Sequence, residues 1–148
     1  MPNERAVTHR WIAPGGDLAD ASRIRRIVFI EEQQVPEEEE WDGLDPQCDH
    51  IVLYVDGRPA ATGRIVWGHP VLLGRIAVLR EHRGTGLGTE VVNRLTEKAF
   101  AAGAEEVHLH AQMHARGFYE KLGFAVYGDP YEEAGIPHIS MRKKRPAT

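Results

Sequence analysis

The sequence predicts one α/β domain in which helices pack on a mixed β-sheet. Its 148 residues suit a single domain over residues 1–148, with a core that needs no disulfide or metal. Apolar residues switch between the period of a strand and that of a helix, in the order β-α-β-β-β-α-β-α-β-β. Three strand-like runs follow one another after the first helix, so strands and helices do not alternate as in a doubly wound fold. We therefore expect an α/β sandwich.

Local signals support the individual elements. Asp17 is a suitable N-cap, Asp56-Gly57 is typical of a tight hairpin turn, and Gly103 and Gly123 are suitable helix ends. The expected elements are a strand at 6–13, a helix at 18–33, an acidic loop at 36–46, a hairpin around 56–57, a strand at 72–79, a helix at 87–102, a strand at 106–113, a helix at 114–122, and strands at 124–128 and 138–144 around a loop at 129–137.

Several classes of protein are excluded at this stage. The longest clean apolar run, "IVLYV" at 51–55, is far shorter than the roughly 20 residues of a membrane span, and the N-terminus has no apolar signal segment. The single cysteine, Cys48, has no partner for an internal disulfide. The basic end "RKKR" at 142–145 is too short to indicate nucleic-acid binding. We expect a soluble cytoplasmic protein with neither a membrane nor a nucleic acid as partner.

Charge is distributed unevenly along the chain, whose formal net charge is −4. Residues 27–57 carry ten Asp or Glu and no Lys or Arg, and the remainder carries twelve acids against eighteen bases, a difference of +6. Such polarity suits an anionic ligand on the basic part and a cationic ligand on the acidic part. For "PEEEE" at 36–40, a solvated acidic loop is the simpler interpretation.

A glycine-rich turn, "REHRGTGLGTEVV" at 80–92, stands where the strand pattern changes into the helix pattern. Backbone N–H groups at such a turn, beside the positive end of a helix dipole, bind phosphate. Arg80 and Arg83 offer additional charge-assisted hydrogen bonds. The P-loop and Rossmann spacings are both absent. The turn therefore predicts a different phosphate ligand, and a plain glycine turn is the alternative.

The motif Arg83-x-x-Gly86-x-Gly88, directly after the strand "GRIAV" and followed by "FYEKLGF" at 118–124, resembles the GNAT family of acetyl-CoA-dependent N-acetyltransferases. The resemblance implies a mixed, largely antiparallel sheet of six to seven strands, flanked by three to four helices. It also implies acetyl-CoA as cosubstrate, no metal, and an amine acceptor that is a small molecule or a peptide. A homodimer is common in the family.

The resemblance further implies where the coenzyme binds. The glycine loop would hold the pyrophosphate, the preceding strand would pair with the pantetheine arm, and Tyr119 would lie near the sulfur. The implied coenzyme-binding residues are Ile76, Ala77, Val78, Arg83, Gly84, Thr85, Gly86, Leu87, Gly88, Thr89 and Tyr119.

Five further stretches resemble the ElaA-type branch of the family. They are "VFIEEQ", "EWDGLD", His50, "AQ" at 111–112 and "GIPHISM" at 135–141, in the same order along the chain. One departure concerns Met113-His114-Ala115, which stands where many GNAT proteins have an asparagine.

Acetyl transfer from a thioester to an amine requires a polarised carbonyl, a neutral amine and a protonated leaving thiolate. We expect the Val78 N–H to bind the thioester oxygen and Tyr119 to protonate the sulfur. Glu32 or His110 would take the proton from the amine. The expected acceptor-binding residues are Glu32, His50, His110, Gln112, Glu133 and His138, although each of them also suits a purely structural role.

Three alternatives remain from the residues themselves. His108 and His110 lie two apart on one side of a strand, where His50 or His138 could complete the zinc site of a hydrolase. A coenzyme A-binding module without turnover would keep the same glycine loop. Cys48 and His50 have the spacing of a nucleophile pair, but a passive cysteine is the simpler interpretation because no oxyanion-hole motif accompanies them.

Overall fold

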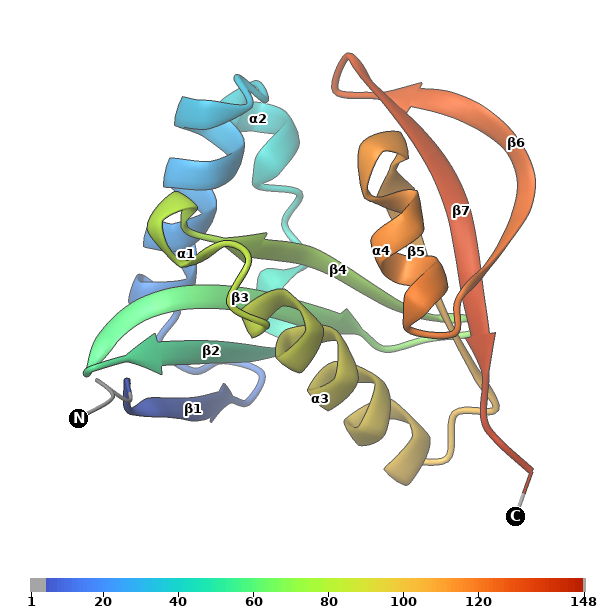
Figure 1. Cartoon of the computed structure of the whole chain (residues 1–148), viewed down its shortest axis with the longest axis horizontal. Coiled ribbons are helices and arrows are strands. Elements are labelled where there is room, and N and C mark those ends of the chain that lie inside the picture. Colours follow the sequence, from blue (N-terminus) through green and yellow to red (C-terminus); the bar gives the residue numbers. More distant parts are fainter. Residues whose placement is uncertain (1–4, 148) are drawn as a thin grey trace.

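The computed structural model describes residues 5–147 and contains one seven-stranded sheet with helices on both faces (Figure 1). The strand order is β1-β2-β3-β4-β5-β7-β6, and only the central pair β4–β5 is parallel. The predicted mixed, largely antiparallel sheet is confirmed. The elements are β1 (Val7–Ile12), α1 (Ala19–Arg25), the π-helical η1 (Arg26–Glu32), α2 (Glu37–Glu40), η2 (Asp45–Gln47), β2 (Asp49–Val55), β3 (Arg58–Val66), β4 (Val71–Val78), η3 (Arg80–His82), α3 (Leu87–Ala101), β5 (Glu106–Gln112), η4 (Met113–Ala115), α4 (Arg116–Lys121), β6 (Ala125–Glu133) and β7 (Ile136–Lys144).

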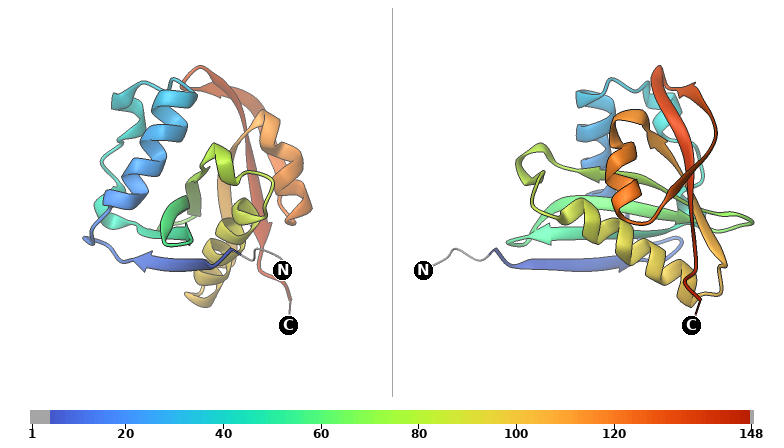
Figure 2. Two further views of the ribbon diagram at one scale, coloured as in Figure 1. Left: turned by 60° about the vertical axis from the view of Figure 1, so that its left-hand side comes forward. Right: turned by 45° about the vertical axis from the view of Figure 1, so that its right-hand side comes forward.

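Each face of the sheet carries its own apolar cluster. On one face, α1 and η1 pack Ile24, Val28 and Phe29 against Val52 of β2 and Ala77 of β4. On the other face, α3 and α4 cover a larger cluster, and the views in Figure 2 show these two helices on the side of the sheet away from α1. In β5 the buried Val107, Leu109 and Ala111 belong to this second cluster, as their alternation predicts. The polar side chains of β5 therefore lie on the face of α1.

The predicted hairpin turn is confirmed, since Asp56 and Gly57 both have positive φ, 51° and 79°, as a tight turn between strands requires. The predicted helix at 18–33 is divided in the structure. Its second half is a π-helical turn, and Gln34 with φ 62° stands just beyond its end. The predicted acidic loop contains the short helix α2.

The predicted loop at 129–137 was wrong. The structure continues β6 to Glu133 and begins β7 at Ile136, so that Tyr131 pairs with His138. The register shifts between Tyr127 and Tyr131. Pro130 lies inside this irregular stretch, on a strand at the edge of the sheet, where a proline is tolerated.

The parallel strands β4 and β5 separate soon after they begin. Their registered pairs run only from Val71–Val107 to Leu73–Leu109. Just beyond this point Arg75, with φ 49°, adds a bulge to β4 opposite β3. The space beyond the Leu73–Leu109 pair, between the ends of β4 and β5, is called the opening below. None of the helices in residues 5–147 has the length and apolar composition to cross a membrane.

Candidate active site

The glycine turn connects β4 to α3 at one side of the opening. Gly84 and Gly86 have φ values of 77° and 90°, a conformation that side chains disfavour. A Cβ at either position would meet no atom within 4 Å, so the space in front of the loop is open. Gly88 has a different role, because its Cβ would lie 3.4 Å from Phe118 Cζ and 3.7 Å from Val78 Cγ2. The first N–H groups of α3, which lack intrahelical partners, are available to an anion.

Arg83 is bound to Glu32 at the end of η1. Arg83 Nη1 and Nη2 donate to the two Glu32 carboxylate oxygens at 2.7 and 2.9 Å, and Arg83 Nε donates to the Val78 carbonyl at 3.0 Å. The hydrogen bond from Arg83 lowers the pKa of Glu32 below its ordinary value. Both carboxylate oxygens of Glu32 are thus occupied, and its lowered pKa makes it a weak proton acceptor. The sequence predicted coenzyme binding for Arg83 and proton transfer and acceptor binding for Glu32, whereas the structure joins the two side chains in an ion pair.

The orientation of Val78 follows from the ladder between β3 and β4. Leu79 N–H donates to the Ala60 carbonyl of β3 at 2.9 Å. Because successive residues of a strand point their N–H groups to opposite sides, the Val78 N–H points away from β3. On that side β5 has already separated from β4. The Val78 N–H is thus directed to the opening.

Tyr119 lies on α4 and packs in the larger apolar cluster. Its ring contacts Phe118 and Phe124 edge to face, with centroids 5.0 and 6.0 Å apart. Burial raises the pKa of Tyr119, so the phenol stays protonated at neutral pH and is available as a proton donor.

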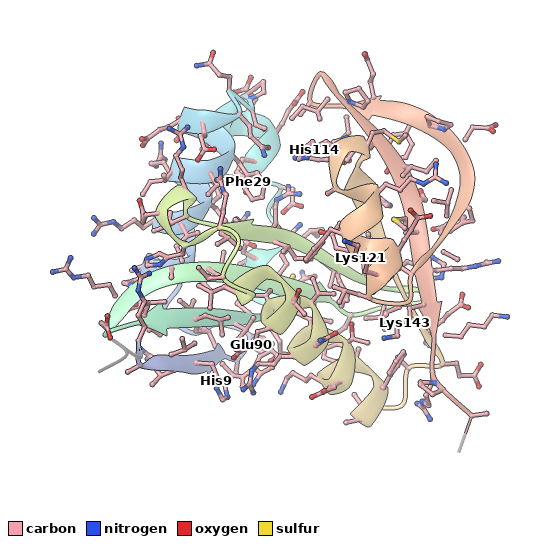
Figure 3. All side chains as sticks on the ribbon, in the orientation of Figure 1. His9, Phe29, Glu90, His114, Lys121 and Lys143 are labelled. Carbon is pink, nitrogen blue, oxygen red and sulfur yellow. The ribbon has the colours of Figure 1, made fainter. Side chains whose placement is uncertain are left out.

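Gln112 stands at the far end of β5, on the other side of the opening. Its Nε2 donates to Gln33 Oε1 at 2.8 Å, and His114 Nε2 lies 2.6 Å from Gln112 Oε1. Figure 3 labels His114, which lies on η4 just before α4, and Phe29, which lies on η1; Gln33 directly follows the last residue of η1. Sequence reasoning missed both Gln33 and His114, although Gln33 directly follows Glu32 in "EEQ".

A group of rings extends the polar face from β5 across β7 to β6. His138 is paired with Gln112 on one side and with Tyr131 on the other. The Tyr131 ring stacks on His138 and meets His110 edge to face, both with centroids 5.9 Å apart. His138 Nδ1 lies 2.7 Å from the Ile136 carbonyl, so this nitrogen carries hydrogen. Its Nε2 lies 3.7 Å from Glu133 Oε2.

Tyr131 is the member of this group that the sequence did not indicate. Burial raises the pKa of its hydroxyl, and the hydroxyl oxygen is enclosed. The residue stood in the segment expected to be a loop. Only its pairing with His138 brings it to the acceptor residues His110, Gln112 and His138.

Residues 21–145 match the family described as acetyltransferase (GNAT) domain. The chain belongs to the GNAT family. The Bacillus subtilis protein YyaT is 42% identical over 137 residues, which cover 90% of this chain and 93% of YyaT. The Escherichia coli protein ElaA is 31% identical over 128 residues, which cover 82% and 84% of the two chains.

Solved structures give the same result for this GNAT domain. The crystal structure of Escherichia coli ElaA superimposes with a TM-score of 0.85 and 27% identity, over 94% of this chain and all of ElaA. An acyl-CoA N-acyltransferase from Pseudomonas aeruginosa superimposes with a TM-score of 0.84 and 28% identity, over 93% and 99% of the two chains. The resemblance to the ElaA-type branch is thereby confirmed.

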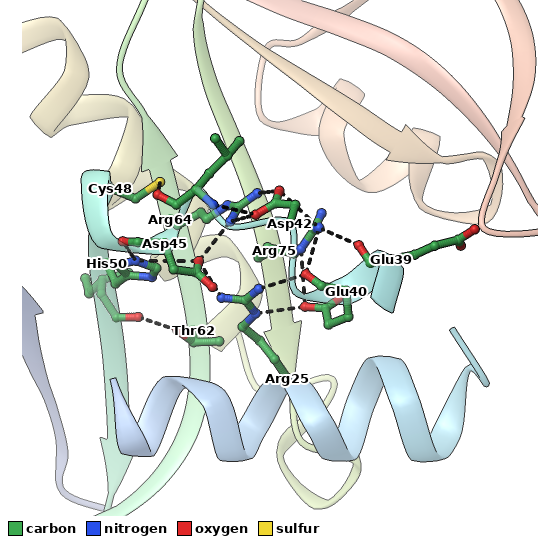
Figure 4. A network of polar contacts seen from close by, with 12 residues as sticks. Arg25, Glu39, Glu40, Asp42, Asp45, Cys48, His50, Thr62, Arg64 and Arg75 are labelled. Atoms are coloured by element: carbon green, nitrogen blue, oxygen red, sulfur yellow. Dashed lines mark hydrogen bonds and ion pairs between the residues drawn. The ribbon is translucent and has the colours of Figure 1, made fainter. Parts of the chain in front are cut away.

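The "EWDGLD" stretch of this GNAT domain takes part in an ion network (Figure 4). Three arginines meet three acids there, so their formal charges cancel. The members are Arg25, Arg64 and Arg75 with Glu40, Asp42 and Asp45. The side chain of Arg25 is 1% exposed and that of Arg64 5%. These three acids are therefore not free to attract a cationic ligand, contrary to what the charge distribution suggested for the segment as a whole.

His50 lies beside this network rather than at the opening. It is 1% exposed, its Nε2 lies 3.1 Å from the Asp45 carbonyl, and burial lowers its pKa. Cys48 is fully buried, its thiol donates to the Leu44 carbonyl at 3.2 Å, and burial raises its pKa. The expected acceptor contact of His50 and the nucleophile pair are replaced by structural roles, since neither side chain is accessible.

The zinc alternative depended on His108 and His110. His108 Nδ1 lies 2.8 Å from the Tyr127 hydroxyl, and its Nε2 lies 2.6 Å from Glu106. Within residues 5–147, the structure brings together no group of three or more His, Cys, Asp or Glu that could hold a metal ion. This alternative therefore has no ligand set in the described part of the chain.

Proposed function

We propose that this GNAT protein transfers an acetyl group from acetyl-CoA to the primary amine of a small molecule or a peptide, by direct attack in a ternary complex. One observation carries the proposal. The β4–β5 ladder stops at Leu73–Leu109, and the Val78 N–H is directed into the resulting opening, next to a glycine turn with open space before it. A thioester bound along β4 would thus find a hydrogen-bond donor for its oxygen.

Each partner of the reaction is assigned to residues of the chain. When bound, the coenzyme supplies the acetyl group as a thioester. The segments 76–78 and 83–89 would hold it, with the pyrophosphate on the N–H groups of the loop. The amine nitrogen forms a bond to the carbonyl carbon and the C–S bond breaks. Tyr119 donates its proton to the leaving sulfur, and the Val78 N–H binds the carbonyl oxygen.

The acceptor would bind on the polar face formed by His110, Gln112, Tyr131 and His138, with Glu133 at its exposed edge. In this proposal His110 takes the proton from the amine, directly or through water, because its side chain is exposed while that of His138 is buried. Glu32 is not the base in this proposal, since Arg83 occupies both of its carboxylate oxygens and the lowered pKa makes it a weak proton acceptor.

The test is thiol release from acetyl-CoA across a panel of primary amines, with controls that lack the amine. Release that depends on at least one amine supports the proposal. Binding of acetyl-CoA by calorimetry without any release would instead favour a coenzyme A-binding module.

We predict that Tyr119→Phe lowers kcat about ten- to a thousandfold, because the variant keeps the ring packing and loses the proton donor. The affinity for acetyl-CoA should change little, because the ring still fills its place. Tyr127→Phe serves as a control, since Tyr127 bonds His108 away from the opening. Full activity of Tyr119→Phe at neutral pH would assign Tyr119 to packing alone.

We predict that His110→Ala lowers the rate of acetyl transfer about ten- to a hundredfold without weakening acetyl-CoA binding. The exposed His9 provides a matched control, because it lies on the edge strand β1, which β2, β3 and β4 separate from β5 (Figure 3). Initial rates with the best amine of the panel would be compared for the two variants. Equal rates for His110→Ala and His9→Ala would contradict the role of His110.

A further inference from the structure

Two consecutive residues at the end of η1 reach the two strands that have separated. Glu32 binds Arg83, whose Nε donates to the Val78 carbonyl at the end of β4. Gln33 exchanges amide hydrogen bonds with Gln112 at the end of β5, at 2.8 and 3.4 Å. Side chains of one dipeptide therefore connect β4 and β5 where the backbone ladder between them is absent.

The end of η1 that carries this dipeptide is itself firmly held. Gln33 N–H donates to the Val28 carbonyl at 3.1 Å, and Val35 N–H donates to the Phe29 carbonyl at 2.8 Å. Phe29 and Val35 are both buried in the smaller apolar cluster. π-helical turns of this kind are frequent at functional sites. A fixed helix end can therefore transmit its position to both strands.

We propose that Glu32 and Gln33 form a brace across the opening, and that Glu32 acts on the reaction through Arg83 as a positioning residue for the Val78 N–H. This inference rests on the proposed function. Arg83 holds the Val78 carbonyl, and the carbonyl and N–H of one strand residue point to the same side. Fixing the guanidinium with a two-oxygen contact thus fixes the direction of the donor for the thioester oxygen.

The expected effect is on kcat rather than on coenzyme binding. Glu32→Met removes both acceptors for Arg83. The Val78 N–H is then misplaced relative to the thioester oxygen, which should lower kcat about ten- to a hundredfold. Glu32→Gln keeps one acceptor oxygen and should recover a large part of this loss. The affinity for free coenzyme A should stay within about threefold, because the pyrophosphate rests on backbone N–H groups.

A binding measurement tests the same geometry without turnover. If the Val78 N–H bonds the thioester oxygen, the protein should bind acetyl-CoA more tightly than coenzyme A. Calorimetry on the Glu32→Met variant should show the ratio of the affinity for acetyl-CoA to that for coenzyme A reduced towards one. Glu31→Gln is the matched control, because the neighbouring Glu31 is exposed and should leave both affinities unchanged.

The contact of Gln33 with Gln112 is the second arm of the brace, beside the contact of Glu32 with Arg83. It is tested with Gln33→Met, alone and combined with Glu32→Met. Both arms hold the same opening, so the double variant should lose less in kcat than the product of the two single losses. The brace would be overturned if the loss of kcat in the double variant equalled the product of the two single losses, or if kcat were unchanged in both single variants. An equal loss in Glu32→Gln and Glu32→Met, with the preference for acetyl-CoA retained, would assign Glu32 to proton transfer instead.

The two proposals fail in different ways. If the wild-type protein releases no thiol with any amine, the proposed function fails. The preference for acetyl-CoA over coenzyme A in the wild type and its loss in Glu32→Met then still decide the brace, since neither measurement requires an acceptor.

Discussion

Gly86→Val is expected to lower the affinity for acetyl-CoA by about 30- to 1000-fold. Losing one or two hydrogen bonds from the loop to a charged phosphate costs about 2–4 kcal/mol, and each 1.4 kcal/mol is tenfold in affinity. The added side chain meets no atom of the chain within 4 Å, so it projects into the open space before the loop. The φ of 90° also forces the loop away from its conformation once a Cβ is present. Calorimetric titration with acetyl-CoA measures the change.

The same helix offers a matched control for backbone strain. Gly103, just beyond the C-terminal end of α3, has φ 103° and equally open surroundings. Gly103→Val should therefore lose a similar amount of stability, about 1–2 kcal/mol, and keep its affinity for acetyl-CoA. If both variants melt alike and both bind acetyl-CoA as the wild type does, the glycine loop is not the pyrophosphate site.

Much of the fold could be predicted because it depends on periodicity and turn residues. Val107, Leu109 and Ala111 alternate with polar residues, and the structure buries them on one face of β5. The glycine turn was located by its spacing after a strand, and the positive φ of Gly86 provides a physical reason for that glycine. These signals are local, so they are visible in a single sequence.

The pairing of charges could not be predicted in the same way. Glu32 and Arg83 are 51 positions apart, and Glu32 is as compatible with a base as with an ion pair until the fold brings the two together. The acids of "EWDGLD" looked like a solvated or ligand-attracting segment for the same reason, because Arg25 and Arg64 lie on other elements. Composition records how many charges a segment has, and only the tertiary structure determines which of them are neutralised.

The last strand pair shows a related limit. Asp129 and Pro130 are strong turn signals, and they led to the prediction of a loop at 129–137. The ladder between Tyr131 and His138 overrides these signals, because an edge strand tolerates an irregular stretch. Tyr131 was missed as a site residue in consequence.

Arg64→Met is expected to lower the free energy of unfolding by about 3 kcal/mol, the lower end of the range for breaking a buried ion pair. The arginine donates to Asp42 and Asp45, and its removal leaves both carboxylates short of a partner. The lower end applies because Asp42 retains contact with water and Asp45 retains Arg25. At roughly 2–4 °C per kcal/mol for a chain of this size, Tm should fall by about 6–12 °C. Arg26→Met, which breaks an exposed pair with Glu37, is the control and should leave Tm nearly unchanged.

The pH dependence of this loss separates charge from packing. Burial is the largest single influence on Asp42 and works to raise its pKa, but the hydrogen bonds from Arg64 and the Leu44 N–H, together with the charges of Arg64 and Arg75, outweigh it and lower the pKa from 3.8 to about 2. A carboxyl whose pKa is lower in the folded state stabilises the protein above the unfolded pKa and loses that contribution as pH falls. The difference in Tm between the wild type and Arg64→Met should therefore narrow between about pH 4 and pH 2. Adding Asp42→Asn to Arg64→Met removes the unpaired charge and should restore part of the loss at neutral pH. A difference in Tm that is constant with pH and shows no such recovery would mean that Arg64 stabilises the fold by filling space beside β3, and not by its charge.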